Sequence, residues 1–323
     1  MMKIFITGGT GFIGKHVIEK LQNDNKFQVI ALTRQKRNDQ QGLLYVHGDV
    51  SDTSLISECI RASDYVIHMA GCKKDPKSFF QANVKGTENV IKACRKSNNL
   101  KKLIYLSSVG VIGKTSNVVV DEQTECHPIN EYEKTKHQAE LIVKEYSKQN
   151  PGHTIILRPT NVFGEDDQQK HLLNLMLKVR MGAFRFVGKD TSRYFLNYLY
   201  VKEISELMPR LLVESVKNDL YTINTPVPLA DFIVAVQKIL ERHEEISHLP
   251  YWPVKLAAMC FDLIPRGLVK HPPVNSLKLN ELTNRVKYSA DRLSEDLDWR
   301  PVFTIKQALS NLAAYYFEKK EMT

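Results

Sequence analysis

A tyrosine and a lysine lie four positions apart in the stretch Tyr132-Glu-Lys-Thr-Lys136, which has the pattern of a helix. This spacing places Tyr132 and Lys136 on one face of the helix, one turn apart. A free tyrosine has a pKa of about 10, which is too high for an efficient base at neutral pH. A neighbouring ammonium, together with the positive charge of a hydride acceptor, stabilises the phenolate and lowers that pKa. The pair is therefore suited to exchange a proton with the oxygen of a secondary alcohol or ketone while a hydride moves at its carbon.

Two serines, Ser107 and Ser108, follow an apolar, strand-like run at residues 103–106. A serine hydroxyl can hold the substrate oxygen in line with the path of the hydride. A tyrosine and a lysine at this spacing also occur by chance on helices, as a simple surface pair. Because Tyr132 stands 24 residues after Ser108, in a chain that also carries a glycine loop, the catalytic interpretation is favoured.

The glycine loop lies between an apolar run at residues 4–6 and a helical pattern that begins at Phe12. Gly8 allows a tight turn, Gly11 lets the backbone approach a pyrophosphate, and Gly14 lets the helix pack closely on the strand. Backbone N–H groups and the helix dipole then face the phosphates. An ordinary strand–turn–helix can carry such glycines too, but a strand before the loop and a helix after it favour a dinucleotide site.

The end of the second predicted strand, at residues 27–32, indicates which dinucleotide binds. A site for NAD usually has an acidic residue there, which accepts hydrogen bonds from the adenosine ribose. This chain has Arg34, followed by Lys36 and Arg37, and no carboxylate before Asp39. A basic loop can arise without any such role, but an arginine can pair with a 2′-phosphate in forked geometry. The sequence therefore favours NADP and leaves NAD open.

Strand-like and helical stretches alternate through the first half of the chain. Strands are expected at 27–32, 43–47, 65–69, 103–106 and 154–158, and helices at 52–63, 76–96 and 130–149, the second of which buries Phe79 and Phe80. Later helices are expected at 172–181, 229–240, 291–297 and 305–317, and a strand at 195–200. This alternation predicts an α/β fold with a doubly wound parallel sheet, whose ligands lie at the carboxyl ends of the strands.

Composition is that of a globular protein, with 323 residues of which 43% are hydrophobic and 25% charged. The net charge of +9 is spread over short clusters, so no nucleic-acid site is expected, although a basic surface can gather an anionic substrate. The five cysteines form no C-x-x-C pair, and Cys126-His127 has no second ligand pair, so we expect reduced thiols, a cytoplasmic location and no metal. No signal peptide is expected, and the apolar stretch at 254–264 is too short to span a membrane.

A series of short motifs resembles the extended short-chain dehydrogenase/reductases, the broad epimerase/dehydratase family. The motifs are TGGTGFIG at 7–14, GDV at 48–50, HMAG at 68–71, NVKGT at 83–87, LSSVGVIG at 106–113, YEKTK at 132–136, LRPTNVFG at 157–164, NYLYV at 197–201 and LDWRP at 297–301. The resemblance implies an NAD(P)-binding Rossmann domain at 1–166, to which 192–215 returns. It also implies a smaller C-terminal α/β substrate domain at 167–191 and 216–323.

The resemblance also implies roles for single residues. Ser108, Tyr132 and Lys136 are the implied catalytic residues, with Ser107 as the less favoured serine. Cofactor contacts are expected from Gly8, Thr10, Gly11, Phe12, Ile13, Gly14, Thr33, Arg34, Asp49, Val50, Ala70, Asn83, Ser107, Lys136 and Arg158. Asn161 and Arg193 are candidates to contact the substrate, and His68 is expected to be a packed core histidine.

Two departures from the family pattern bear on the substrate. Members that dehydrate nucleotide sugars carry an Asp-Glu pair right after the catalytic hydroxyl residue, whereas this chain has Val109-Gly110, so elimination is not expected. Many sugar-nucleotide members have an arginine that grips the diphosphate just before the strand at 197–201. This chain has Leu196 there, and Arg193 is the candidate to replace the arginine.

Three functions stay open on the sequence. The favoured one is hydride transfer on a nucleotide-activated sugar, as a 4-epimerase or a 4-keto reductase. The second is the reduction or oxidation of an apolar ketone or alcohol, as in hydroxysteroid and flavonol-reductase-like branches. The apolar segment 249–269 resembles the C-terminal helices of those branches, although a core or dimer helix is its simpler interpretation. The third is an NADP-binding protein without activity, which the intact Ser-Tyr-Lys set disfavours. A small-molecule substrate and a homodimer are expected.

Overall fold

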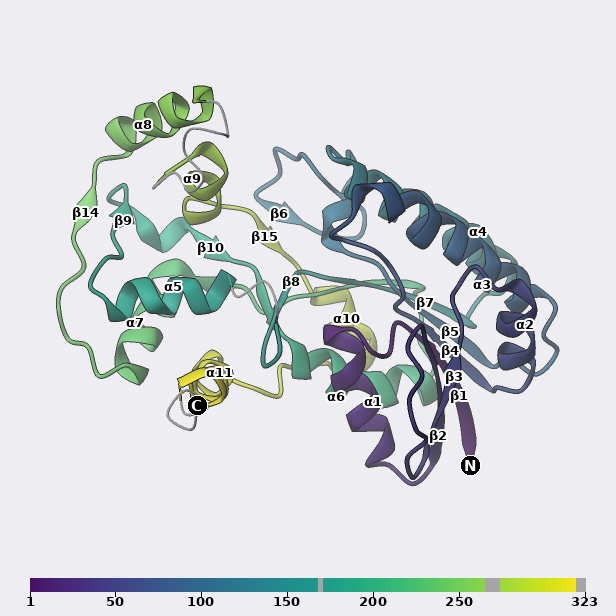
Figure 1. Ribbon diagram of the computed structural model, residues 1–323. Coiled ribbons are helices and arrows are strands. Elements are labelled where there is room, and N and C mark those ends of the chain that lie inside the picture. The colour runs from purple at the N-terminus through teal and green to yellow at the C-terminus, as the bar shows by residue number, and fades with distance from the viewer. Residues whose placement is uncertain (168–170, 265–273, 318–323) are drawn as a thin grey trace.

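One large parallel sheet organises the protein, whose computed structural model describes residues 1–167, 171–264 and 274–317 (Figure 1). Its seven strands run in the order β12-β7-β5-β4-β1-β2-β3. They are β1 Met2–Thr7, β2 Phe27–Thr33, β3 Leu43–His47, β4 Tyr65–His68, β5 Lys102–Leu106, β7 Thr154–Pro159 and β12 Leu220–Ile223. All neighbouring pairs are parallel, so the carboxyl ends of the strands lie at one edge. The strand order reverses between β1 and β4, which is where ligands bind in such sheets.

Helices cover both faces of this sheet, as the alternation of elements predicts. One face carries α1 (Phe12–Gln22), α6 (Val201–Val213) and α10 (Asp291–Leu297), and the other carries α2 (Thr53–Arg61), α3 (Gly86–Arg95) and α4 (Glu131–Gln149) (Figure 1). Side chains of Asp52 and Asn130 accept hydrogen bonds from the first turns of α2 and α4, which fixes where these two helices begin. The doubly wound α/β fold is therefore confirmed.

The helix expected at 76–96 is broken into three pieces. A 3-10 turn at Pro76–Ser78 and a π-helix at Phe80–Lys85 precede α3. Phe79 is buried, but Phe80 is exposed, contrary to expectation, because adjacent helical residues point in different directions. Gly86 begins α3 where a Cβ would lie 2.7 Å from Cγ2 of Val50, so close packing explains this glycine.

The structure corrects one predicted boundary, since parts of 216–323 belong to the large sheet. Residues 220–223 form β12, which pairs in parallel with β7 and is buried at every position. Helix α10 follows much later in the chain and packs on the same sheet through Leu293 and Leu297. A four-residue strand carries too little periodic signal to be assigned from sequence.

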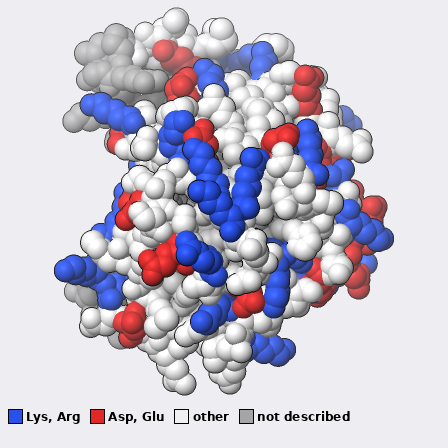
Figure 2. Space-filling model, turned by 90° about the vertical axis from the view of Figure 1, so that its right-hand side faces the viewer, with Lys and Arg blue, Asp and Glu red and all other residues white. Residues whose placement is uncertain are grey.

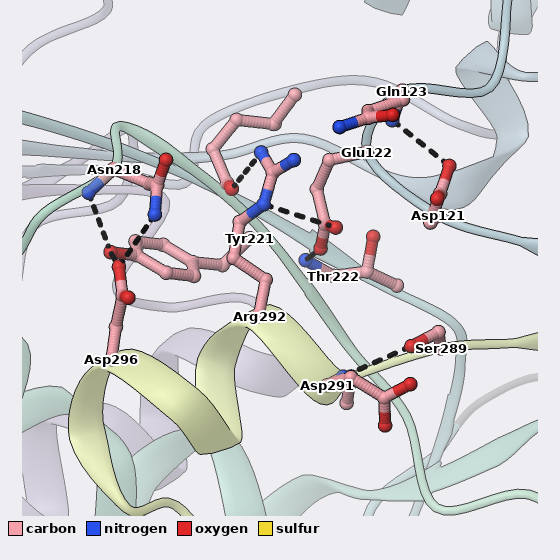
Figure 3. A network of polar contacts seen from close by, with 12 residues as sticks. Asp121, Glu122, Gln123, Asn218, Tyr221, Thr222, Ser289, Asp291, Arg292 and Asp296 are labelled. Carbon is pink, nitrogen blue, oxygen red and sulfur yellow. Dashed lines mark hydrogen bonds and ion pairs between the residues drawn. The ribbon is translucent and has the colours of Figure 1, made fainter.

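A polar network fastens this returning segment to the sheet (Figure 3). Asn218 Nδ2 and Tyr221 Oη donate hydrogen bonds to Oδ2 of Asp296, at 2.7 and 2.6 Å. The backbone N–H of Thr222 donates to Oε1 of Glu122, from the loop after β6 (Val119–Val120). The network therefore joins β12, α10 and the loop before α4.

The elements that do not cover the large sheet form a smaller part of the molecule, and this part has its own hydrophobic core. Helices α5 (His171–Arg180), α7 (Leu229–Ile239) and α11 (Ile305–Phe317) contribute to it, and α8 (Tyr251–Leu263) and α9 (Ser276–Leu282) lie beside it (Figure 1). The expected helices at 172–181, 229–240 and 305–317 are confirmed. In the ranges that the structure describes, no helix is long and apolar enough to cross a membrane.

Among the described residues, four pairs of short strands lie outside the large sheet. The strand expected at 195–200 is two strands, β10 (Phe195–Leu196), which pairs with β13 (Val227–Pro228), and β11 (Tyr198–Tyr200), which pairs with β8 (Asn161–Phe163). The other short pairs are β6 with β15 (Lys287–Tyr288) and β9 (Phe186–Val187) with β14 (His248–Leu249). On the face seen in Figure 2, basic and acidic side chains are interspersed and do not form one continuous basic stripe.

Candidate active site

A cavity of about 570 Å³ opens at the carboxyl ends of the central strands. It is lined by the loop between β1 and α1, the ends of β5 and β7, and the first turns of α4, with α5 and α9 on the far side. Of the predicted site residues it brings together Gly8, Gly11, Phe12, Ile13, Gly14, Asn83, Ser107, Ser108, Tyr132, Lys136 and Asn161. The predicted catalytic residues and the glycine loop therefore face one space.

The glycine loop has the geometry of a phosphate cradle. Gly8 has a φ of +75°, and a Cβ there would lie 2.6 Å from the backbone nitrogen of Ala70. A Cβ on Gly14 would lie 2.2 Å from the carbonyl oxygen of Gly8, so α1 can approach the loop only with glycine at this position. Helix α1 begins after Gly11 without a side-chain cap, which leaves its first N–H groups for a ligand. The loop therefore fits a pyrophosphate.

Tyr132 lies in the first turn of α4 and lines the cavity. The ring of Phe79 packs edge-on against it, with 5.8 Å between the centroids. Burial, together with the neighbouring Glu133 and Cys72, raises the pKa of Tyr132 to about 12. Lys136 by itself therefore does not lower this pKa, and the predicted lowering also requires the positive charge of a bound nicotinamide. The hydroxyl is protonated at neutral pH and can donate a proton.

Lys136 is buried one turn further along α4. Its Nζ donates hydrogen bonds to Oη of Tyr105 and to the carbonyl oxygen of Leu106, at 2.8 and 2.9 Å. Burial lowers the pKa of Lys136 to about 8, although Glu140 acts in the opposite direction. Two of the three N–H groups of the ammonium are thus used inside the protein, and one is left for a hydroxyl in the cavity.

The two serines after β5 have different partners. Ser107 Oγ donates to Oε2 of the buried Glu140 at 2.6 Å. Ser108 is half-buried, lines the cavity, and its Oγ accepts a hydrogen bond from the backbone N–H of Gly110 at 3.1 Å. Because the hydroxyl of Ser107 is directed at a carboxylate inside the protein, this geometry supports Ser108 as the serine that meets a substrate.

Arg158, predicted to contact the cofactor, does not line the cavity. Its side chain is fully buried, and its Nε and Nη2 donate to Oε2 and Oε1 of Glu140 at 2.9 and 2.6 Å. Lys144 Nζ lies 2.9 Å from the same carboxylate. Burial alone would raise the pKa of Glu140, yet Arg158 and Lys144 outweigh it and lower this pKa to about 2. Arg158 therefore ties β7 to α4 beneath the site.

Residues predicted to meet the adenosine half of the cofactor lie outside this cavity. Arg34 is exposed directly after β2, and the next carboxylate, Asp39, accepts a hydrogen bond from the backbone N–H of Tyr45 at 2.7 Å. Asp49 accepts two hydrogen bonds from Ser51, at 3.0 and 2.9 Å. The other predicted residues outside the cavity lining are Thr10, Thr33, Val50 and Ala70. Arg34 is thus an exposed cation at the end of β2, where the phosphate of a ligand can pair with it.

A second cavity of about 350 Å³ shares Ser108, Tyr132 and Asn161 with the first. Leu196 lines it, at the place where the family pattern predicts an arginine. Arg193 is absent from the described residues that line either cavity, because its exposed guanidinium lies 2.8 Å from Oδ2 of Asp190. The structure therefore brings Asn161 to the candidate catalytic groups and leaves Arg193 outside.

Lys73 faces both cavities and was missed from sequence. Its Nζ lies 6.0 Å from the centroid of the Tyr132 ring. The pKa of Lys73 is lowered, because the effect of burial is larger than the opposing effect of the charge of Asp167. The available signal was its place two residues after the HMAG motif, at a strand end. Lys73 therefore places a positive charge at the second cavity, where Leu196 stands in place of the arginine that the family pattern predicts.

His68 is a core histidine, as expected. Its ring nitrogens lie 2.6 Å from Oγ1 of Thr7 and 2.9 Å from Oγ1 of Thr87, and burial lowers its pKa to about 3. A neutral imidazole held between two hydroxyls joins β4 to β1 and α3. His68 is not among the described residues that line the cavity.

Comparison with known proteins identifies the relatives of this chain. A sequence model of the NAD dependent epimerase/dehydratase family matches residues 4–223, which span the large sheet from β1 to β12. The chain is 27% identical to the N-acetyl-alpha-D-glucosaminyl-diphospho-ditrans,octacis-undecaprenol 4-epimerase of Escherichia coli O157:H7, over 97% of this chain and 95% of that protein.

Other similar proteins carry out different reactions. The chain is also 27% identical to the 2-alkyl-3-oxoalkanoate reductase of Stenotrophomonas maltophilia, over 97% of this chain and 99% of that protein. Its fold is similar to that of dTDP-glucose 4,6-dehydratase from Bacillus anthracis in complex with NAD, with a TM-score of 0.72, 19% identity, and coverage of 99% and 98% of the two chains.

Proposed function

Because this chain belongs to the NAD-dependent epimerase/dehydratase family, we propose that it is an enzyme that transfers a hydride at a secondary alcohol or ketone carbon. The observation that carries this proposal is that Ser108, Tyr132 and Lys136 line the same cavity as the glycine loop. The favoured substrate is a nucleotide-activated sugar, and the favoured reactions are 4-epimerisation and 4-keto reduction. The similar 4-epimerase from Escherichia coli, the cation of Lys73 and the net charge of +9 support a substrate with a diphosphate.

Each residue of the site has a distinct task in this proposal. The nicotinamide ring of NAD(P), when bound, supplies or accepts the hydride. Gly8, Gly11 and the first N–H groups of α1 hold the pyrophosphate. Ser108 orients the substrate oxygen, and Tyr132 gives it a proton or takes one from it. The remaining N–H of Lys136 binds a hydroxyl of the nicotinamide ribose.

Reduction is the favoured reaction within this proposal. The hydroxyl of Tyr132 is protonated at neutral pH and can give its proton to a forming alkoxide, which a reductase needs and an epimerase needs in one of its two half-reactions. An NADP-type pocket favours the reductase, because an epimerase recycles its cofactor and does not need the reduced pool of the cell. Interconversion of C4 epimers without net consumption of NADPH would contradict reduction and favour the epimerase.

Substrate assays with NADPH and NADH test the proposed function. We expect turnover of a UDP- or dTDP-linked sugar, measured as loss of cofactor absorbance for 4-keto reduction and by nuclear magnetic resonance of the sugar for 4-epimerisation. The second candidate function is reduction of an apolar ketone, which the similar 2-alkyl-3-oxoalkanoate reductase and the apolar Leu196 favour. A lipophilic ketone turned over in the same assay, with every nucleotide sugar inert, would select that candidate.

We propose that Arg34 gives the enzyme a preference for NADP(H). Arg34→Ala is expected to weaken binding of NADPH about 10- to 100-fold and to change binding of NADH less than twofold, because only the 2′-phosphate accepts a charge-assisted, forked hydrogen bond. Fluorescence titration of both cofactors measures the effect. Arg61→Ala, at the end of α2, is the matched control and should leave both affinities unchanged. Tighter binding of NADH by the unaltered protein would refute the preference.

The five cysteines fit the proposed cytoplasmic location. Cys59, Cys72, Cys94, Cys126 and Cys260 are all free thiols. Burial raises the pKa of Cys59 to about 11 and that of Cys94 to about 12, so these two thiols are unreactive. Free thiols persist in a reducing compartment.

A further inference from the structure

Helix α8 presents an apolar stripe to solvent. Trp252, Leu256, Met259 and Leu263 are 72, 64, 52 and 84% exposed. Their spacing of four, three and four residues places them within an arc of about 60° on the helix. Isolated exposed apolar residues are common on proteins, but a contiguous stripe marks an interaction surface.

The opposite side of α8 is fixed to the protein. Ala258 is fully buried and packs with Val187 of β9 and Leu279 of α9. The carboxylate of Asp262, which is the acidic residue of α8, accepts a hydrogen bond from the backbone N–H of Ser276 at 3.2 Å. Helix α8 is therefore packed against the protein along one side, and the apolar stripe faces solvent on the other side.

A lysine flanks the aromatic end of the stripe. Nζ of Lys255 lies 5.1 Å from the centroid of the Trp252 ring and 5.9 Å from that of Tyr251. A lysine next to an exposed tryptophan, along an apolar stripe, is typical of helices that lie in the interfacial plane of a membrane. The net charge of +9 adds attraction to an anionic lipid surface.

We propose that α8 docks the protein onto an anionic membrane surface through Trp252, Leu256, Met259 and Leu263. A second copy of the chain is a weaker candidate for the occupant. An exposed patch of this kind covers on the order of a few hundred Å², whereas a stable interface buries about 800 Å² on each partner. A lipid bilayer needs no surface of complementary shape, so a stripe too narrow for a stable protein–protein interface can still insert between lipid headgroups.

Docking through α8 would place the reaction cavity near the lipid headgroups. Helix α9 packs against α8 and contributes Glu281 to both cavities. The surface therefore suits a sugar whose diphosphate is carried by a membrane lipid instead of a nucleoside, and this refinement of the substrate rests on the proposed function. The docking itself does not depend on it.

Vesicle binding tests the proposal directly. The protein is expected to sediment together with vesicles of phosphatidylglycerol and phosphatidylethanolamine. Binding to these vesicles should also shift the tryptophan emission of the protein to shorter wavelength. The chain has two tryptophans, and Trp299 is only 5% exposed, so the shift reports Trp252. Binding should weaken as salt is raised and on vesicles of phosphatidylcholine alone, because part of the attraction is electrostatic. Absence of sedimentation with the anionic vesicles would refute the docking.

Variants locate the surface and separate docking from catalysis. Trp252→Ser combined with Leu256→Ser should lower the vesicle partition coefficient at least about tenfold, with unchanged circular dichroism and unchanged turnover of a soluble substrate. Val234→Ser and Val302→Ser remove exposed apolar side chains elsewhere and should leave the partition coefficient unchanged. If the unaltered chain is a dimer in solution and the double variant is a monomer, α8 is a contact between copies and the proposal is wrong. Vesicle binding without turnover of any sugar would leave the docking intact and reject the proposed function.

Discussion

Tyr132→Phe is expected to lower kcat about 10²–10⁴-fold, which is the usual contribution of a positioned acid or base. The phenyl ring keeps the edge-on contact with Phe79 and the packing in the cavity, and only the hydroxyl is lost. The affinity for NADPH should stay within about twofold, because the glycine loop holds the pyrophosphate independently of Tyr132. Steady-state kinetics and cofactor titration measure the two quantities.

The control for this variant is Tyr146→Phe. Tyr146 lies on the same helix and is buried, but it is not among the residues that line the cavity. Removing its hydroxyl should change kcat by less than about threefold. A Tyr132→Phe enzyme with near-normal turnover, or a Tyr146→Phe enzyme with an equal loss, would show that Tyr132 does not transfer the proton.

Short-range patterns predicted most of the candidate site. The four-residue spacing of Tyr132 and Lys136 is a property of any helix, and the glycines at 8, 11 and 14 follow from a strand that must turn tightly into a helix. These features need no knowledge of distant contacts. The parallel sheet followed from apolar strands alternating with helices, and its carboxyl edge then located the cavity.

Contacts between distant elements could not be predicted in the same way. Lys136 was expected to act on Tyr132, but its ammonium reaches Tyr105 on β5 instead. Arg158 was expected to face the cofactor, yet it points at Glu140 across the interface between β7 and α4. In both cases the direction of a long side chain is set by a partner that the local pattern does not reveal.

The boundary near residue 216 failed for a related reason. Strand β12 has four residues, and helix α10, which follows about seventy residues later, packs against it. Asp296 and Tyr221 meet only after the chain has passed through the smaller part and returned (Figure 3). A pattern read along the chain predicts elements, but the pairing of a short edge strand is decided by packing.

Glu140→Gln is expected to destabilise the protein by about 3–5 kcal/mol, because it leaves the guanidinium of Arg158 buried without its counter-charge. Urea unfolding near pH 7 measures this loss. Glu145→Gln is the matched control, since Glu145 is exposed on the same helix and pairs with Lys148 only at 3.6 Å, which is worth less than about 1 kcal/mol. The double variant Glu140→Leu with Arg158→Met should recover much of the stability, because it removes both charges together.

The same pair predicts how stability depends on pH. The pKa of Glu140 falls from an ordinary 4.5 to about 2 in the folded protein, so the carboxylate contributes stability that is fully present above pH 4.5. That contribution, roughly 3 kcal/mol by linkage, is lost as the pH falls from about 4.5 towards 2. The difference in unfolding free energy between the unaltered protein and Glu140→Gln should therefore be constant from about pH 8 to pH 5 and shrink below that. A difference that stays constant down to about pH 3 would mean that Arg158 does not hold the charge of Glu140 in the folded state.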